Sequence, residues 1–318
     1  MNDEGAASIS MKSQADSDAI LRRVSSAIVL GAAVVLIVAK LWGWMATDSV
    51  ALLTSVADAV VDALAATATF FGVRFAQRPA DSMHRFGHGK GEALAAFTQA
   101  VLLGSTAIVL GAESLWRMIY PQPLTAITFG LWIAVGGFAI SSLLAAMQSW
   151  VVRRTGSTAI AADRTHYLMD AVLNGAVLAA LALTRATGWE RADPTFALVI
   201  AGCMIAGARR VAETASRQLL DHELPQEQRE RIKQVVVACS GVCGIHDLRT
   251  RDAGDRVFVE FHLEVDGEVS VSEGHDIVDA AECAIVALFP KETEVIGHLE
   301  PEGMADERLD DRVLHTDH

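Results

Sequence analysis

Two pairs of polar residues interrupt long apolar stretches of the chain, and each pair has the spacing of one helical turn. Asp58 and Asp62 lie in TSVADAVVDALAATATFF, and His166 and Asp170 lie in THYLMDAVLNGAVLAALAL. Residues four apart share one face of a helix. A charged group at membrane depth costs several kcal/mol unless a partner compensates it, so such residues mark functional sites. The two pairs together predict a site of three carboxylates and one imidazole for a small divalent metal, four ligands as a tetrahedral zinc site requires.

Structural roles are the alternative for both pairs. The two aspartates could form an interhelical polar contact, and Lys40, the one candidate lysine inside the apolar stretches, could pair with one of them. A lone buried histidine usually makes only a hydrogen bond. Two acids one turn apart in an apolar helix, however, need strong positive charge nearby, which favours a metal. No cysteine stands at these positions, which disfavours copper(I).

A second candidate metal site lies in RPADSMHRFGHGKGE, where Asp81, His84 and His88 could converge on an ion. The intervening glycine favours a loop over a helix, and a solvated basic loop without metal is an equal alternative. Further histidines are spread along the last third of the chain. His298 and Glu300 are two apart in an expected strand and so share a face, but ordinary surface histidines are the alternative. The others are His246, His262 and His275.

The elements that carry the first two pairs are expected to cross a membrane. The chain has 318 residues, 52% of them hydrophobic, and a mean hydropathy of +0.32, which is too apolar for an ordinary soluble protein. Six stretches approach or exceed the roughly 18 to 20 apolar residues that span a bilayer. The first is too long for a signal-peptide core, so we expect a retained helix. The six are expected at residues 25–46, 50–74, 93–120, 127–152, 159–184 and 195–211.

Basic residues cluster at alternate turns of this pattern, at 22–23, 74–90, 153–154 and 209–210. By the positive-inside rule these turns face the cytoplasm, which places both termini there. Hydrophobicity falls after Leu220, and the order helix, strand, strand, helix, strand follows. It predicts a small αββαβ domain with an open sheet. The expected divisions are a disordered tail (1–20), a membrane all-α domain of six helices (21–220), the α+β domain (221–302) and an acidic tail (303–318).

Charge and motifs exclude several functions. The net charge of −13 argues against nucleic acid as a partner. The four cysteines form no CxxC pair, so neither a disulfide framework nor a zinc knuckle is expected. No phosphate-binding loop is present, and HELPQ at His222 lacks the second histidine of a zinc protease. We therefore expect neither an ATP-driven pump nor an enzyme.

Taken together, the DxxxD and HxxxD pairs, the loop PADSMHRFGHGKGE, the junction LLDHELP and the segment GIHDLRTR resemble the cation diffusion facilitator family. Within it, the chain is most similar to the bacterial ferrous-iron and zinc efflux pumps, from about residue 21 to 301. The resemblance implies a homodimer in the bacterial inner membrane, with six helices per protomer and a cytoplasmic metal-binding domain.

The resemblance also assigns residues. It implies that Asp58, Asp62, His166 and Asp170 form the transport site, and that Asp81, His84 and His88 form the loop site. His246, His262, His298 and Glu300 would hold zinc in the cytoplasmic domain with His275 nearby, and Lys90 and Asp221 match a charge pair that links the two parts. Glu300 stands where close relatives have aspartate, which leaves the geometry of that zinc site open.

The expected activity is export of zinc, and also of cadmium or iron(II), by alternating access in exchange for protons, because metal and protons compete for the same ligands. The alternatives are a membrane-anchored metal sensor and a carrier whose main ion is iron(II) or manganese. The ligand set does not rank these metals or cobalt.

Overall fold

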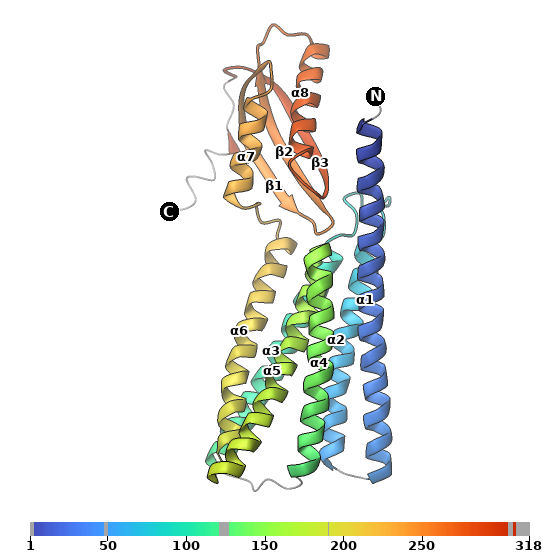
Figure 1. Ribbon diagram of the computed structural model, residues 1–318. Helices are drawn as coiled ribbons and strands as arrows, with labels where there is room; N and C mark the ends of the chain where they lie inside the picture. Colours follow the sequence, from blue (N-terminus) through green and yellow to red (C-terminus); the bar gives the residue numbers. More distant parts are fainter. Residues whose placement is uncertain (1–2, 48–49, 121–126, 190, 305–307, 310–318) are drawn as a thin grey trace. The chain divides into compact units, whose positions relative to one another are not determined.

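The computed structural model describes residues 3–47, 50–120, 127–189, 191–304 and 308–309, with some helical residues, Asp58 among them, described by their backbone alone. The chain divides into two compact units between Ser216 and Arg217. We call them the membrane unit and the αββαβ unit, and Figure 1 labels their elements.

Six helices form the membrane unit, and each contains a segment long and apolar enough to cross a bilayer, which confirms the expected six spans. α5 illustrates how the sequence sets their ends. The Ser157 side chain caps its start by accepting a hydrogen bond from the Ile160 N–H, and Gly188 ends it in the left-handed conformation that glycine adopts without strain. The helices are α1 Asp3–Thr47, α2 Val50–Ala76, α3 Gly91–Ile119, α4 Ile127–Thr155, α5 Thr158–Thr187 and α6 Ala192–Leu219.

Small residues line the contacts between these helices. A Cβ atom added to Gly72 of α2 would lie 2.4 Å from the Cβ of Ala95 on α3. Ala159 of α5 and Ala107 of α3 are fully buried. Membrane helices associate through such close packing because lipid offers no hydrophobic drive between them. The close approach of α2, α3 and α5 is what lets polar side chains from different helices meet.

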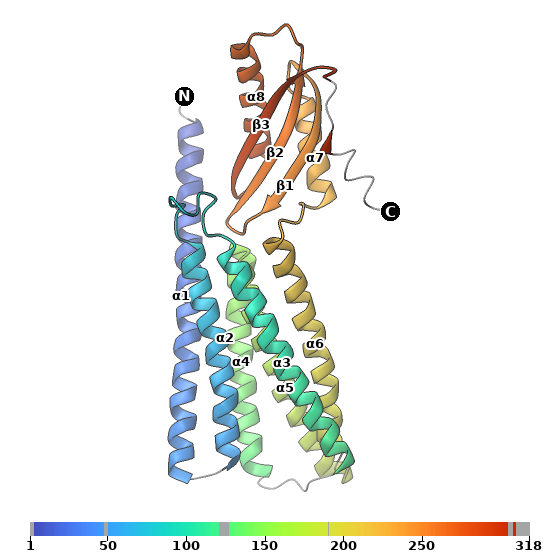
Figure 2. The same ribbon diagram turned by 180° about the vertical axis from the view of Figure 1, so that it is seen from behind.

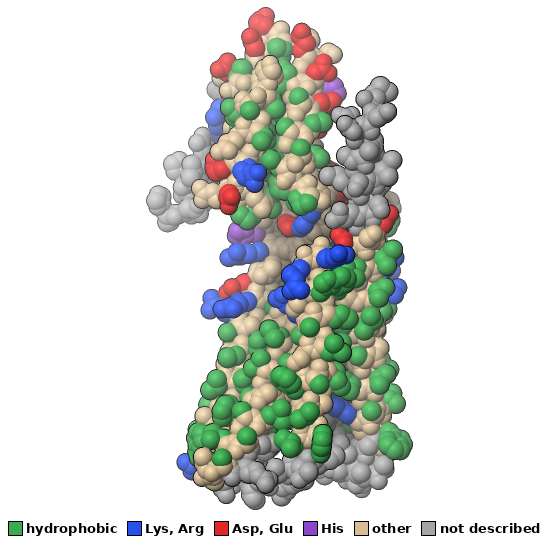
Figure 3. Space-filling model, in the orientation of Figure 1, with side chains coloured by type: hydrophobic (Ala, Val, Ile, Leu, Met, Phe, Trp, Pro, Cys, Tyr) green, Lys and Arg blue, Asp and Glu red, His purple; other side chains and the backbone are tan. Residues whose placement is uncertain are grey.

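Basic residues gather at one end of the membrane unit, which we call the basic end. Arg22 of α1 donates to Glu92 at the start of α3 over 3.1 Å, and Ser157 at the start of α5 donates to the other oxygen of the same carboxylate over 2.5 Å. On the face drawn in Figure 3, the Lys and Arg side chains of this unit lie mostly near that end, and hydrophobic side chains are spread over the remainder. This distribution is the one that the positive-inside rule describes.

The first helix begins earlier than the sequence predicts. A disordered tail is expected over residues 1–20, whereas α1 is helical from Asp3. Extending an existing helix fixes one residue per hydrogen bond, without a new nucleation cost. No proline interrupts residues 1–47, so the helix of the first span can continue toward the N-terminus.

The αββαβ unit has the predicted order of elements. β1 and β2 are antiparallel, and β2 and β3 are parallel, in the sheet order β1-β2-β3. This confirms the small α+β domain. Its elements are α7 Gln226–Val237, β1 Val242–Asp252, β2 Arg256–Val265, α8 Val271–Val286 and β3 Glu292–Pro301.

Both helices of this unit cover the same face of the sheet (Figures 1 and 2). Alternate residues of β2, among them Val259, Phe261 and Leu263, are buried in a core with Ile232 of α7 and Ile285 of α8. Successive side chains of a strand point to opposite faces. The even-numbered residues of β2 therefore project from the other face, which we call the open face.

Candidate metal sites

Three of the four residues predicted for the transport site come together inside the membrane unit, and we call them the membrane cluster. Nε2 of His166 lies 3.0 Å from Oδ1 of Asp62 and 3.5 Å from Oδ2 of Asp170. One ligand atom from each residue lies within 4.8 Å of the other two, a spacing that suits a shared ion. The histidine side chain is 4% exposed, whereas the two carboxylate side chains are 34% and 24% exposed. The carboxylates thus form the accessible edge of the cluster.

The fourth predicted residue, Asp58, lies one turn before Asp62 in α2, but its side chain is outside the described residues. Its part in the membrane cluster stays a prediction. Asp58 and Asp62 are four residues apart on α2, and the same spacing places His166 beside Asp170 on α5. Packing of α2 against α5 supplies the contact between the two helices.

The loop between α2 and α3 brings Asp81, His84 and His88 together, and we call them the loop cluster. Oδ2 of Asp81 lies 3.5 Å from Nε2 of His88, and its Oδ1 lies 3.1 Å from Nδ1 of His84. One ligand atom from each lies within 4.8 Å of the others. The His88 ring is buried edge-on against Phe75, with its centroid 4.8 Å from that of the phenyl ring. The glycine between the histidines therefore belongs to a loop that folds back on itself, as expected.

Backbone hydrogen bonds prepare Asp81 for a cation. Its Oδ1 accepts from the N–H of His84 over 2.7 Å and from that of Met83 over 2.8 Å. These bonds, that of His84 first, lower the pKa of the Asp81 carboxyl below its ordinary value because they favour the charged form. The carboxylate is consequently ionised and oriented before any metal arrives.

A third group of ligands lies on the open face of the αββαβ unit, and we call it the sheet cluster. His246, His262 and His298 stand opposite one another on the three adjacent strands. Glu300, whose side chain is 7% exposed, reaches all three: its carboxylate lies 2.8 Å from Nδ1 of His262, 3.3 Å from Nε2 of His246 and 3.5 Å from Nε2 of His298. The glutamate that departs from the family pattern is thus central to this cluster.

The contacts within the sheet cluster are close but are not hydrogen bonds. Nδ1 of His246 lies 3.0 Å from Oε1 of Glu264, and Nδ1 of His262 lies 2.8 Å from Oε1 of Glu300, yet neither nitrogen has a hydrogen-bond partner of acceptable angle among the described residues. Imidazole and carboxylate groups so arranged fit a zinc ion.

The structure adds Asp247 to this region, which the sequence did not indicate. The register of β1 against β2 shifts between His246 and Arg249, and Asp247 has a φ of 50°. This irregularity brings ligand atoms of two consecutive residues, His246 and Asp247, within 4.8 Å of each other and of one on His262, although neighbours in a regular strand point apart. A left-handed conformation at a residue other than glycine costs about 1 kcal/mol and is typical of functional positions.

Two residues near the C-terminus contact the same carboxylates. Nη2 of Arg308 donates to Oε1 of Glu264 over 2.7 Å, and the Leu309 N–H donates to Oδ2 of Asp247 over 2.9 Å. A cationic side chain therefore occupies one of the oxygens beside His246. A metal that takes Oε1 of Glu264 as a ligand competes with this side chain.

The family resemblance places His275 near the cytoplasmic zinc site, and within one protomer the structure leaves it apart from the sheet cluster. His275 lies on α8, whose face of the sheet is opposite to the open face. Its side chain is 71% exposed and lies 3.6 Å from Asp279. A helix that packs its apolar side against one face of the sheet cannot send a side chain through the core to the other.

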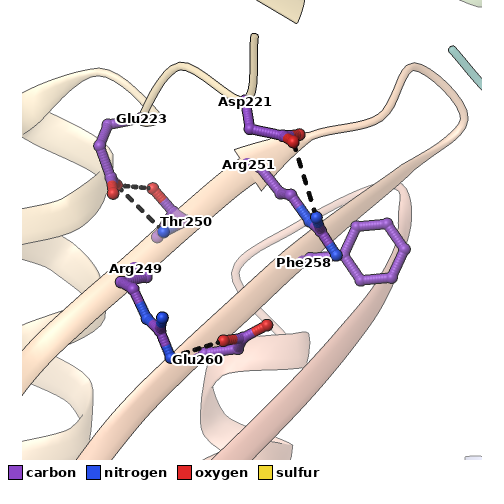
Figure 4. A pocket seen from close by; sticks show the side chains of 7 residues that line it. All are labelled: Asp221, Glu223, Arg249, Thr250, Arg251, Phe258 and Glu260. Carbon is purple, nitrogen blue, oxygen red and sulfur yellow. Dashed lines mark hydrogen bonds and ion pairs between the residues drawn. The ribbon is translucent and has the colours of Figure 1, made fainter. Parts of the chain in front are cut away.

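The predicted charge pair joins two residues that belong to different units, Lys90 at the start of α3 and Asp221 after α6, and it stays a prediction. Within the αββαβ unit, Asp221 lies 3.7 Å from Arg251, whose guanidinium stacks on Phe258 (Figure 4). These residues line a cavity of about 230 Å³ together with Glu223, Arg249, Thr250 and Glu260. Arg249 in turn lies 2.9 Å from Glu260. Both arginines of the cavity thus have acidic partners, which argues against an anion site.

Two family models match the chain in succession. One is described as the cation efflux transmembrane domain and covers residues 26–220, and the other is described as the cytoplasmic domain of cation efflux proteins and covers residues 224–302. Their junction falls close to the division between the two units.

Known proteins resemble the chain over most of its length. The cation-efflux pump FieF of Yersinia enterocolitica is 38% identical over 276 residues, 87% of this chain and 91% of that protein. FieF of Pectobacterium carotovorum is 39% identical over 269 residues, 85% and 89% of the two chains. A solved structure of CzrB in its zinc form is 40% identical over 27% of this chain and 99% of that chain, with a TM-score of 0.25.

Proposed function

Because the chain belongs to the cation efflux family, the cation diffusion facilitators, it is a transporter of divalent metal ions and not an enzyme, and we propose that it exports zinc in exchange for protons. Cadmium and iron(II) are further candidate cargoes. The observation that carries the proposal is the membrane cluster, in which two acids and an imidazole from two helices meet at hydrogen-bond distance inside an apolar bundle.

The ligand set supports exchange. Asp62, His166 and Asp170, with Asp58 as the proposed fourth ligand, bind metal only when deprotonated, so each bound metal displaces protons. In the state open to the cytoplasm, zinc replaces protons on these groups. In the state open to the other side, protons from the more acidic compartment replace zinc. A pH gradient then drives export without ATP.

The general affinity order of divalent metals, and not the ligand set by itself, supports zinc as the main cargo. One imidazole with carboxylates is a common zinc environment, and the Irving–Williams order places zinc above iron(II) and manganese in affinity. Iron(II) and cadmium fit the same ligands, so the preference among them is set by relative affinity and by supply.

The αββαβ unit supports a regulatory role for resident zinc and a homodimer. His246, His262, His298 and Glu300 would hold the ion on the open face, and a sheet that leaves one face uncovered can bury it against a second copy. Zinc bound there would strengthen dimer contacts and favour the transporting state. The loop cluster offers a further metal site within the membrane unit, between α2 and α3.

The basic end supports a placement in the bacterial inner membrane with both termini in the cytoplasm. Three arginine pairs lie in the parts of α1, α4 and α6 that this topology places on the inner side, at residues 22–23, 153–154 and 209–210. Metal then enters from the same side as the αββαβ unit.

Flux into proteoliposomes with an imposed pH gradient tests the proposal. Zinc, cadmium, iron(II) and manganese are compared in the natural protein and in Asp58→Ala and Asp170→Ala. The proposal predicts gradient-dependent zinc flux that both substitutions abolish while the dimer stays folded. Zinc binding without flux of any metal would instead support a membrane-anchored sensor. Flux dominated by iron(II) or manganese would support the alternative cargo.

A further inference from the structure

A buried carboxylate that is not part of any metal cluster lies one turn from the membrane cluster. Asp163 of α5 is 1% exposed and precedes His166 by three residues, about 4.5 Å along the helix axis. Asp163 is therefore nearer than His166 to the start of α5, which lies at the basic end. An acidic side chain within a membrane-spanning segment is costly and marks function by default.

Two buried amides hold this carboxylate. Nε2 of Gln99 on α3 donates to Oδ1 of Asp163 over 2.8 Å, and Nε2 of Gln148 on α4 donates to Oδ2. Both glutamines are 1% exposed. Gln99 also contacts Oγ1 of Thr69 on α2 over 2.9 Å. We call Thr69, Gln99, Gln148 and Asp163 the polar layer, and it joins four helices.

The polar layer lies between the membrane cluster and the basic end on both helices that build the cluster. On α5 it lies one turn before His166. On α2 it lies two turns after Asp62, because Thr69 follows by seven residues and α2 ends at the basic end. Under the proposed topology, the layer lies on the path between the cluster and the cytoplasm.

The donors that hold the Asp163 carboxylate carry no charge of their own. The side chains that reach it from α3 and α4 are neutral amides, and the hydroxyl from α2 is neutral too. The charged groups that interact with it among the described residues are His166 and Asp170, on its own helix, and Asp62 on α2. Each of its oxygens accepts a hydrogen bond from an amide, and Asp163 is not among the described residues whose ligand atoms group around His166.

Three buried atoms around Asp163 have no hydrogen-bond partner among the described residues: Oε1 of Gln99, Oε1 of Gln148 and Nδ1 of His166. Buried polar atoms nearly always have partners, and a site with several such atoms holds water. Water between these atoms would connect the membrane cluster to Asp163 with groups that transfer protons and do not bind metal.

We propose that Asp163 is a proton-relay residue, through which protons pass between the membrane cluster and the cytoplasmic end of the helices. A proton that metal displaces from the cluster moves through water to a carboxylate oxygen of Asp163. Asp163 then releases this proton to bulk water at the basic end. Gln99 and Gln148 position the carboxylate and keep it away from the metal. The inference rests on the proposed exchange of metal for protons.

Two transport modes of the full protein in proteoliposomes separate this role from a structural one. Net zinc flux driven by a pH gradient needs protons to leave and enter the site. Exchange of radioactive zinc for unlabelled zinc at equal pH on both sides needs no net proton movement. For Asp163→Asn, which keeps the shape of the side chain, we expect exchange within about threefold of the natural protein and net flux at least tenfold lower. Asp163→Glu, which restores a carboxylate, should recover part of the net flux.

Glu113→Gln is the matched control, since it removes an exposed carboxylate of α3 that pairs with Arg117 outside the polar layer, and both modes should be unchanged. Equal loss of exchange and net flux in Asp163→Asn, or loss of neither, overturns the relay. Should Asp163→Asn fail to fold, Gln148→Leu takes its place, and it should slow net flux while leaving exchange intact. If net zinc flux through the natural protein does not depend on the pH gradient, the proposed function itself is overturned.

Discussion

His166 on α5 and Asp62 on α2 meet with Nε2 and Oδ1 3.0 Å apart, although 104 residues separate them in the sequence. The contact joins the second residue of the polar pair on α2 to the first residue of the polar pair on α5. A metal that binds between them replaces an imidazole–carboxylate contact with two metal–ligand bonds. Occupancy of the site and the packing of α2 against α5 are therefore coupled.

Replacing the imidazole in this contact should change which metals are carried. In His166→Asp, a nitrogen ligand of borderline softness becomes an oxygen ligand, which favours harder ions. We expect the ratio of zinc to manganese flux to fall by about tenfold, equivalent to about 1.4 kcal/mol in relative binding. Competitive flux assays with mixed metals measure this ratio. An unchanged ratio would place selectivity outside His166.

The loop cluster gives a prediction about pH. The backbone N–H groups of His84 and Met83 lower the pKa of Asp81, so the folded loop binds its proton less tightly than the unfolded chain does. The stabilisation is present above the ordinary aspartate pKa and is lost as the pH falls through the lowered value. At pH 5 the Asp81 carboxylate should therefore still be ionised. Any loss of metal binding to the loop cluster at that pH should come from protonation of ligands other than Asp81.

Carbon-13 spectra of labelled aspartate, assigned with Asp81→Asn, measure that pKa. We expect a midpoint below the ordinary value of 3.8. His84→Ala should retain most of the shift, because it keeps the backbone donor that is the main cause. A midpoint at or above the ordinary value would mean that these hydrogen bonds do not form.

The contact between Arg308 and Glu264 predicts competition with metal at the sheet cluster. A partly exposed ion pair is worth about 0.2–1 kcal/mol, so Arg308→Ala should raise zinc affinity there by up to about fivefold. Titration against a coloured chelator measures the affinity, in a full-length background of Asp170→Ala and His88→Ala that weakens the other two clusters. Arg249→Ala is the control, since it lies on the open face and pairs with Glu260. Unchanged or weaker binding in Arg308→Ala contradicts the competition.

Close packing of α2 on α3 predicts the effect of a single methyl group. In Gly72→Ala the new Cβ would lie 2.4 Å from that of Ala95, so the helices must separate, at a cost of about 1–3 kcal/mol. Gly104→Ala is matched, because its Cβ would meet that of Ala208 at an ordinary 3.8 Å. Thermal unfolding in detergent should show a lower midpoint for the first and little change for the second. Equal midpoints would remove the steric argument.

The sequence predicts those parts of the sites that depend on helical or strand period. A spacing of four residues places His166 beside Asp170, and a spacing of two places His298 beside Glu300, because these periods belong to the backbone itself. The sequence patterns do not predict Asp163 as a site residue, although it lies one turn before His166. Its two glutamine partners come from other helices, and no period links them in the sequence.

Irregular backbone and helix placement limit prediction in the αββαβ unit. Asp247 joins His246 only because β1 changes register there, and the one aspartate in GIHDLRTR is too weak a turn signal to predict that change. His275 lies in the helix that the sequence predicts, but which face of the sheet that helix covers is decided by packing. The face is what separates His275 from the other histidines.

Proton movement during zinc entry tests the central claim most directly. Proteoliposomes that hold a pH indicator, with equal pH on both sides, receive external zinc as the only driving force. Exchange predicts that the interior becomes alkaline as zinc enters through the natural protein, and that Asp170→Ala shows neither zinc entry nor a pH change. Zinc entry without a change in internal pH would contradict proton exchange.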